Sequence, residues 1–594
     1  MDSLLRYPFD PLAIIRKKKS LKRALLEKNG LLDKRVAILG GSTTFEIKEI
    51  LELFLLDLGI RPTFYESEYN KFYEDVVFPN PELEAFAPDV AFIHTTQANV
   101  TRWPAPGMAE TEVDALYEAE CAKLAAVWDG LREKYGCAVI QNNFDLPPVR
   151  PLGNLDCVNH AGRTRLVLRL NEAIAARARA DKAFCVHDIN HLSAFMGLEK
   201  WYDPQFWYAY KYALSYEAIP TFCHNLAAII GALWGKNKKC LVLDLDNTLW
   251  GGVIGDDGVN GIQLGTETAQ AEAYSDFQGY LKELKARGVM LTVCSKNEPE
   301  SAREGLGHPD AVLREDDFTM IKANWMPKPD NIQEIIATIN IGIDSAVFVD
   351  DNPAEREIVR SQLPLVAVPE MGNDVARYIR ILEGCRYFET VSLSEDDLKR
   401  VAYYAANAKR QDVQSRFENY GDFLRSLEMT AEIRPFEDVY LDRITQLTNK
   451  TNQFNLTTRR YTMAEITAVA ASDAHVAIYG RLVDKFGDNG LIAVVIGAQR
   501  GDALHIDLWL MSCRVLKRNM EQAMFDSLVR RARERGVRTI HGHYYATPKN
   551  KMVAGHYESL GFSLAARAGN GDSEWIFTIP DDFTNTNDII QVTE

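Results

Sequence analysis

The chain has 594 residues, enough for about three or four domains, and a net charge of −16 at neutral pH. This acidic balance argues against a nucleic-acid-binding surface, which needs a basic footprint. The nine cysteines form no C-x-x-C pair, as expected of reduced thiols rather than of disulfides or a zinc site. No apolar run is long enough to span a bilayer and no signal peptide opens the chain, so we expect a cytoplasmic protein without membrane contact.

Residues 1–234 are predicted to form an α/β domain behind a helical lead-in. Arg35–Leu39 predicts a strand that runs into Gly40-Gly41-Ser42-Thr43-Thr44, and the helical pattern of Phe45–Leu58 follows. A hydroxyl and backbone N–H groups at a helix N-terminus can hold an oxyanion or an acyl carbonyl. Two more strands are predicted, at Pro88–His94 and Ala138–Asn143.

The end of this domain carries a D-x-x-H pair, Asp188 and His191. With the serine after the first strand, the layout resembles the SGNH hydrolase fold, a flavodoxin-type sheet. The resemblance implies Ser42 as nucleophile, His191 as base and Asp188 as its orienter. The usual G-D-S of that fold reads G-G-S here, so a docking or degenerate domain stays an alternative to an acyl hydrolase.

The run L-V-L-D-L-D-N-T-L-W, Leu241–Trp250, predicts a buried parallel strand that ends in two carboxylates, Asp244 and Asp246. Residues two apart on a strand face the same way, and open α/β sheets hold their sites at the carboxyl ends of the strands. Two convergent carboxylates suit Mg²⁺ and a phosphate, with one aspartate to attack phosphorus and the other to move a proton.

Three further motifs follow in order. Cys294-Ser295-Lys296-Asn297 ends a predicted strand, Lys328 lies in W-M-P-K-P-D-N-I, and Asp350-Asp351-Asn352-Pro353 ends another predicted strand, Ala346–Val349. Together with the D-x-D-x-T-L run, they resemble the haloacid dehalogenase (HAD) superfamily, and residues 235–390 are predicted to form this domain.

The HAD resemblance implies a magnesium site and a phosphate site. Mg²⁺ would be held by Asp244 and by Asp351 or Asp350, assisted by the backbone carbonyl of Asp246. The phosphate would be held by Ser295 and Lys328. A helix is predicted at Ala271–Arg287, and short helical pieces between Ser295 and Lys328. Neither insertion point has room for a large cap domain, so the site is expected to admit a bulky substrate.

The motifs resemble one HAD subgroup in particular, the FkbH-like proteins, through G-G-V-I-G-D-D-G after Trp250, V-C-S-K-N, V-D-D-N-P-A-E-R and the Asn- and Thr-rich run Leu447–Arg459. This resemblance implies transfer of a glyceryl group from 1,3-bisphosphoglycerate, with loss of phosphate, to the phosphopantetheine thiol of an acyl carrier protein in polyketide-type biosynthesis. Cys294 is then a candidate acyl acceptor. Because side chains alternate on a strand, Cys294 and Ser295 could instead face opposite ways, with Cys294 an ordinary buried cysteine.

Residues 391–594 are predicted to form a linker helix, Glu395–Tyr420, and a third domain. Strands are predicted at Val476–Tyr479, Leu491–Ile496, His505–Met511 and Val537–Tyr544, with helices at Met520–Arg535 and Val553–Ser559. This order and the Y-x-x-L-G-F near the end resemble the GNAT acyltransferase fold.

The GNAT resemblance implies a site for an acyl-carrying arm. The positions that match its Q/R-x-x-G-x-G/A loop read R-V-L-K-R-N, so both glycines are lost and two cations are gained. We interpret the domain as binding a carrier-borne phosphopantetheine, with a purely structural role as the alternative. The implied residues are Asn452, Asn455, Thr457, Arg459, Arg514, Lys517 and Arg518.

The sequence therefore predicts a three-domain α/β protein with three functional hypotheses. The first is a glyceryl transferase that acts on a discrete holo acyl carrier protein, because no carrier domain is found in the chain. The second is a Mg²⁺-dependent phosphohydrolase without a thiol acceptor. The third is a non-catalytic carrier-docking scaffold, which the intact acidic motifs disfavour.

Overall fold

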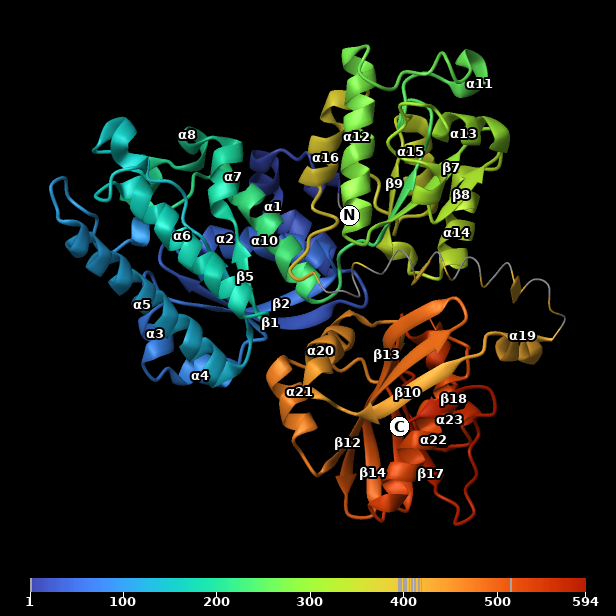
Figure 1. Cartoon of the computed structure of the whole chain (residues 1–594). Helices are drawn as coiled ribbons and strands as arrows, with labels where there is room; N and C mark the ends of the chain where they lie inside the picture. Colours follow the sequence, from blue (N-terminus) through green and yellow to red (C-terminus); the bar gives the residue numbers. More distant parts are fainter. Residues whose placement is uncertain are drawn as a thin grey trace. The chain divides into compact units, whose positions relative to one another are not determined.

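The computed structural model describes residues 3–393, 419–512, 515–547 and 549–594, with one or two residues at a time between 393 and 419. The chain divides into two compact units, Met1–Leu233 and Trp234–Glu594 (Figure 1). The domain boundary predicted after residue 234 lies next to this division. The second unit holds two separate sheets, and the boundary predicted after residue 390 stays a prediction. Most of the predicted linker helix lies outside the described residues.

The first unit is built on a five-stranded parallel sheet in the order β2-β1-β3-β4-β5. This is the doubly wound order 2-1-3-4-5 of flavodoxin-type sheets. The sequence analysis missed β2, an edge strand interrupted by Arg61 and Pro62. The strands are β1 (Leu32–Gly40), β2 (Ile60–Glu66), β3 (Val90–His94), β4 (Ala138–Asn142) and β5 (Phe184–His187).

Two groups of helices pack in this unit. α1 (Pro11–Leu26), α2 (Phe45–Asp57) and α10 (Ala218–Leu233) pack together, while α5 (Glu110–Tyr135) packs with α6 (Arg163–Ala180). α10 is apolar around most of its circumference, as a buried helix should be. Neither it nor any other described helix is long and apolar enough to cross a membrane. The shorter helices are α3 (Glu74–Val77), α4 (Pro81–Phe86), α7 (Ile189–Met196), α8 (Leu198–Trp201) and α9 (Pro204–Tyr210).

The first sheet of the second unit has four parallel strands in the order β8-β7-β6-β9. They are β6 (Cys240–Leu243), β7 (Met290–Ser295), β8 (Met320–Ala323) and β9 (Ala346–Val349). The expectation that only short helical pieces separate Ser295 from Lys328 is wrong, because β8 forms the sheet edge there. The helices are α11 (Ile254–Asp257), α12 (Ala269–Ala286), α13 (Pro299–Leu306), α14 (Lys328–Ile339), α15 (Pro353–Gln362) and α16 (Tyr378–Gly384).

The other sheet of this unit is mixed, in the order β16-β17-β15-β14-β13-β12-β10-β18, with β11 paired to β14. Its strands are β10 (Thr430–Pro435), β11 (Phe454–Asn455), β12 (His475–Asp484), β13 (Gly487–Arg500), β14 (Ala503–Met511), β15 (Thr539–Tyr544), β16 (Ser563–Arg567), β17 (Ser573–Thr578) and β18 (Gln591–Thr593). The helices are α19 (Tyr420–Ser426), α20 (Leu441–Lys450), α21 (Met463–Ala470), α22 (Met520–Glu534) and α23 (His556–Ser559).

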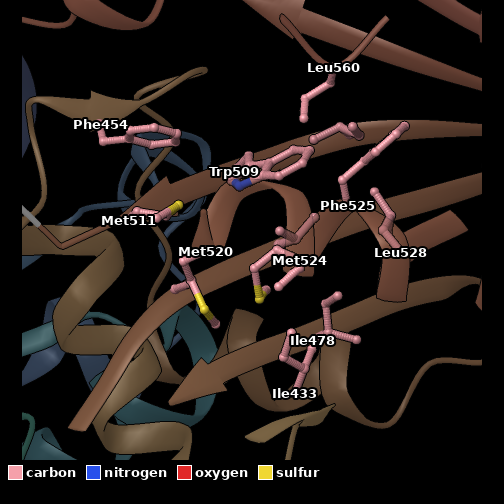
Figure 2. Packing of buried hydrophobic residues seen from close by; sticks show 14 of the residues in the cluster. Ile433, Phe454, Ile478, Trp509, Met511, Met520, Met524, Phe525, Leu528 and Leu560 are labelled. Atoms are coloured by element: carbon pink, nitrogen blue, oxygen red, sulfur yellow. The ribbon is translucent and has the colours of Figure 1, made fainter. Parts of the chain in front are cut away.

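The core of the mixed sheet forms between its strands and α22. Met520 and Met524 of that helix face the sheet residues Ile433 and Ile478 (Figure 2), whereas Phe525 packs against Phe562 with ring centroids 5.5 Å apart. These side chains and Trp509 are almost fully buried. The strands and helices predicted in this region are confirmed as elements.

Candidate functional site

The polar residues of the four motifs meet at one edge of the parallel sheet. Asp244 directly follows β6, Asp350 directly follows β9, and Ser295 is the last residue of β7. Leu243 pairs with both Val293 and Val349, so the carboxyl ends of these three strands lie side by side. This is the edge at which open parallel sheets hold their sites.

Lys328 joins the motifs. It begins α14, and its Nζ lies 3.0 Å from Asp244 Oδ1 and 2.5 Å from Asp350 Oδ2. Ser295 donates its hydroxyl to the same Asp244 oxygen across 2.7 Å. All four residues are buried. A cation and a hydroxyl therefore converge on one carboxylate oxygen in a place with little water.

Burial and charge shift the acid–base properties of this group. Burial and the neighbouring Asp244 carboxylate raise the pKa of Asp350 to about 6, against the lowering effect of Lys328. Burial also raises the pKa of Asp351, again with help from Asp244. Burial would lower the pKa of Lys328, but Asp244 and Asp350 outweigh it and raise that pKa, so Lys328 stays charged. The group thus contains more negative charge than one lysine balances.

Three carboxylates can share a cation here. Among the described residues, Asp244, Asp350 and Asp351 form the one group of three in which an oxygen from each lies within 4.8 Å of the others. Asp351 is held in place by Thr248, whose Oγ1 accepts the Asp351 N–H across 3.2 Å. Carboxylate oxygens at this spacing fit a hard divalent cation.

The Asp246 carboxylate is not in that group but is held beside it. Its Oδ1 accepts hydrogen bonds from Trp250 Nε1 at 2.9 Å and from the Ile254 N–H at 3.0 Å, and its Oδ2 accepts one from Asn297 Nδ2 at 2.9 Å. These donors fix the direction of the Asp246 carboxylate. The predicted contribution of Asp246 to a metal through its backbone carbonyl stays a prediction.

The sequence analysis did not foresee the residues that shape the turn after β6. Asn247 has a left-handed backbone, φ 53°, which short polar side chains tolerate. Its carbonyl accepts hydrogen bonds from Tyr274 and Tyr378, each at 3.2 Å. The tyrosines come from helix α12 and helix α16, and no local pattern in the sequence signals their approach.

Cys294 faces away from the carboxylates. It belongs to the hydrophobic cluster on the other side of β7, and its Sγ lies 3.7 Å from the backbone carbonyl of Lys328. Burial raises the pKa of its thiol to about 12. The neighbouring cation Lys296 pairs with Glu355 at 2.6 Å. The geometry thus favours the ordinary buried cysteine over the acyl acceptor.

The three residues of the predicted hydrolase site do not form a triad. The described structure has no hydrogen bond between any two of the side chains of Ser42, Asp188 and His191. The Ser42 hydroxyl is buried without a partner. Asp188 caps α7, with Oδ1 accepting the backbone N–H of His191 at 3.0 Å and Asn143 Nδ2 at 2.7 Å. The exposed His191 ring stacks on Phe195. The D-x-x-H pattern serves here as a helix cap.

The residues predicted to bind an acyl arm are also separated. Arg514 lies outside the described residues. Arg518 is buried and pairs with Asp484 at 3.1 Å, so it is part of the interior rather than of a basic loop. Lys517 is exposed, and Arg459 is half exposed and pairs with Asp507 at 3.1 Å.

The remaining three of these residues hold the loop that surrounds β11. Asn452 accepts a hydrogen bond from Arg460, Asn455 accepts one from the Thr458 N–H, and Thr457 donates one to the Asp507 carbonyl. Asn455 and Thr457 therefore bond to backbone, and Asn452 bonds to the Arg460 side chain. Their predicted part in binding an acyl arm stays a prediction.

Comparison with known proteins shows the superfamily of this chain. A HAD-like hydrolase superfamily protein of Schizosaccharomyces pombe is 34% identical over 141 residues, 20% of this chain and 80% of the relative. The chain belongs to the HAD-like hydrolase superfamily. The assignment of the HAD motifs to Asp244, Ser295, Lys328 and Asp350 stays a prediction, and the convergence of these four residues at one sheet edge is compatible with it. No family model matches the chain.

Solved structures extend the likeness beyond the HAD-like segment. A crystal structure of the N-terminal part of a Bacteroides fragilis protein, which contains a phosphatase domain complexed with Mg, is 31% identical with a TM-score of 0.58. The match covers 63% of this chain and 99% of that one. GNAT structures are also similar, among them the ribosomal-protein-S18-alanine N-acetyltransferase of Escherichia coli, at 15% identity and a TM-score of 0.21 over 27% of this chain and 98% of that one.

Proposed function

We propose that the HAD-like site removes phosphate from a phosphorylated substrate with the help of Mg²⁺. The observation that carries this proposal is the convergence of Ser295 and Lys328 on one oxygen of Asp244, beside Asp350 and Asp351. Superfamily membership and the magnesium complex of the similar Bacteroides fragilis phosphatase domain support it. Cleavage of a phosphate ester needs a nucleophile, cations that offset the negative charge and a group that carries a proton, and this site offers each of them.

The side chains share the work of this mechanism, and Asp244 has two roles, as nucleophile and as a ligand of Mg²⁺. Ser295 and Lys328 both contact Oδ1 of Asp244, so Oδ2 is the oxygen that we assign to attack on phosphorus. The attack breaks the bond between phosphorus and the leaving-group oxygen, and water then hydrolyses the aspartyl phosphate, which releases phosphate and restores Asp244. Lys328 neutralises charge that develops on the phosphate oxygens. Mg²⁺ bound by Asp244, Asp350 and Asp351 would withdraw further charge from them. Asp246, held by its three donors, carries the proton to or from the leaving group.

We further propose that the substrate is 1,3-bisphosphoglycerate. The HAD-like site removes the 3-phosphate, and the phosphopantetheine thiol of a discrete acyl carrier protein attacks the acyl carbon and expels the 1-phosphate, so that a glyceryl thioester forms. The FkbH-like sequence pattern supports this finer assignment. The rim of the site is compatible with it, because α11, in the loop after β6, has only four residues. Trp325 and Met326, just before Lys328, expose 68% and 57% of their surface. Exposed apolar side chains beside the site suit a bulky substrate carried by a partner.

The test uses full-length protein with Mg²⁺, enzymatically generated 1,3-bisphosphoglycerate and a panel of holo carrier proteins. Intact mass of protein and carriers is measured together with released phosphate. We expect phosphate release and a glyceryl increment on one carrier, both lost in Asp244→Asn. A matched control is Asp276→Asn, which removes an exposed carboxylate from α12 outside the site.

The outcomes separate the two levels of the proposal. Phosphate release without an adduct on any carrier would leave a Mg²⁺-dependent phosphohydrolase and remove the glyceryl transfer. Full phosphate release by Asp244→Asn would overturn the assignment of the site itself.

A further inference from the structure

The loop that carries Asp350 and Asp351 is fastened by a residue from outside the carboxylate group. Arg356 lies on α15, and one nitrogen of its guanidinium, Nη1, donates to the backbone carbonyl of Asp350 across 2.8 Å and to that of Asp351 across 2.6 Å. Both carbonyls precede α15, so the hydrogen bonds within that helix do not use them. Arg356 therefore ties the first turns of α15 to the end of β9.

The peptide unit between the two aspartates is bonded at both ends. Its carbonyl, that of Asp350, accepts a hydrogen bond from Arg356. Its N–H, that of Asp351, donates to Thr248 Oγ1 across 3.2 Å. Because a peptide unit is planar, hydrogen bonds at both of its ends fix the orientation of the whole plane. The two bonds therefore set the direction in which the carboxylates of Asp350 and Asp351 leave the backbone.

The surroundings of Arg356 favour this role over a general contribution to stability. The residue is 5% exposed, and its Nε hydrogen-bonds to no described group. Its ion-pair partner, Glu370, lies 3.5 Å from Nη2, which is long for a charge-assisted hydrogen bond. Burying a cation with so loose a partner costs stability. The bonds to the two aspartate carbonyls are the shortest that the described structure gives this guanidinium.

We propose that Arg356 is a positioning residue for Mg²⁺, because it holds the backbone of Asp350 and Asp351. Their carboxylates then face the cation that Asp244 also binds. The inference rests on the Mg²⁺ site of the proposed function. Arg356 acts through the backbone of two metal ligands, and no proton passes through it. Residues that orient the ligands of a metal in this way contribute about 10–100-fold to its affinity.

The experiment compares Arg356→Met with Arg360→Met in the full-length protein. Arg360 is a matched control, because it lies on the same helix, donates to the Val368 carbonyl across 3.2 Å and pairs with Glu370 at 2.5 Å. The affinity for Mg²⁺ is measured by calorimetry without substrate, at one fixed pH. We expect Arg356→Met to weaken Mg²⁺ binding about tenfold or more, and Arg360→Met to change it less than about twofold. Arg356→Lys keeps the charge and a hydrogen-bond donor, and it should restore part of the affinity.

Folding and activity are measured separately. The unfolding temperature of each variant is measured in EDTA and in Mg²⁺, and Mg²⁺ should raise it less in Arg356→Met than in the wild type. For half-maximal phosphate release, Arg356→Met should need about tenfold more Mg²⁺, a shift that a loss of stability alone would not produce. If Arg356→Met does not fold, Arg356→Lys is compared with Arg360→Lys.

The outcomes separate this inference from the proposed function. Wild-type affinity for Mg²⁺ in Arg356→Met, or an equal loss of affinity in Arg360→Met, would overturn the role of Arg356 and leave the proposed function standing. Mg²⁺ binding by the wild type without phosphate release would overturn the proposed function, and the comparison of affinities would still decide the role of Arg356.

Discussion

Lys328 holds its ammonium nitrogen 2.5 Å from Asp350 Oδ2, with both side chains almost completely buried. The same nitrogen reaches Asp244 Oδ1, so one lysine faces two carboxylates that belong to different strand ends. Without it, the group Asp244, Asp350 and Asp351 would be a buried cluster of negative charge. A divalent cation can supply the same compensation. The stability of this part of the chain should therefore depend on both cations together.

Replacing Lys328 with alanine should destabilise the metal-free protein strongly. Removing one partner of a buried ion pair costs roughly 3–5 kcal/mol, because the other charge is left uncompensated. Mg²⁺ should recover part of this loss. The measurement is the midpoint of urea unfolding, with and without Mg²⁺, for the transition whose midpoint Mg²⁺ shifts.

Lys296→Ala is the matched control: Lys296 also pairs with a carboxylate, Glu355 at 2.6 Å, but is 40% exposed. Its loss should cost less than about 1 kcal/mol. An equal loss of unfolding free energy in Lys328→Ala and Lys296→Ala would contradict the claim that burial makes the Lys328 ion pairs the more costly to break.

Asp244→Asn should reduce phosphate release to below about one thousandth of the wild-type rate, because an amide oxygen is a poor nucleophile. Ser295→Ala should lose less, about 10²–10³-fold, because it removes one hydrogen bond to the same carboxylate. Single-turnover phosphate release compares the two variants with Asp276→Asn. A Ser295→Ala protein slower than Asp244→Asn would reverse the assigned roles.

Cys294 should be unreactive and dispensable. Its thiol is buried, and burial raises its pKa to about 12, so almost no thiolate exists at neutral pH. Iodoacetamide should label the exposed Cys157 and leave Cys294 unlabelled in the native protein, as read by peptide mass spectrometry. Cys294→Ala should keep both phosphate release and any carrier loading. A glyceryl adduct on Cys294 would show that β7 changes conformation during turnover.

The strand ends of this site could be predicted from sequence because each motif is a local signal: an apolar run followed by polar residues. The alternation that separates Cys294 from Ser295 is equally local and was available as an argument. The contact between Lys328 and Asp350 could not be predicted from the sequence, because it depends on how α14 packs beside the sheet. The strand β8 was missed because Met320–Ala323 is short and only partly buried.

The misjudged cations and triad have the same physical origin. Arg518 looks like a surface cation in a basic loop, and only the fold reveals Asp484, which lies 34 residues earlier, as its buried partner. Asp188 and His191 match both a catalytic pair and a helix cap, since a cap also joins residues three apart. Spacing alone does not distinguish these uses, whereas the direction of the histidine ring does.

Mg²⁺ binding should strengthen as the pH rises and level off above about pH 6. Burial and Asp244 raise the pKa of Asp350 to about 6, so below that pH the folded protein holds a proton that Mg²⁺ must displace. The raised pKa of Asp350 also affects the free energy of unfolding of the metal-free protein. It stabilises the fold in acid, and this stabilisation is lost as the pH rises through about 6. Calorimetric titration with Mg²⁺ from about pH 5 to pH 8, in buffers of different ionisation enthalpy, would detect the released proton. An affinity independent of pH over that range would contradict the shifted pKa.

Ser42→Ala and Asp188→Ala should affect stability in opposite ways. The Ser42 hydroxyl is buried without a partner, so its removal should leave the first unit as stable or slightly more stable. Asp188→Ala removes the cap of α7 and the partner of Asn143, and should cost about 1 kcal/mol. Urea unfolding measures the stability of both variants.

Hydrolysis of a simple aryl ester tests the alternative that the first unit is an acyl hydrolase. A working triad would make Ser42→Ala and His191→Ala lose a measurable esterase activity together. We expect Ser42→Ala and His191→Ala to leave the rate of ester hydrolysis unchanged, because the exposed His191 ring stacks on Phe195.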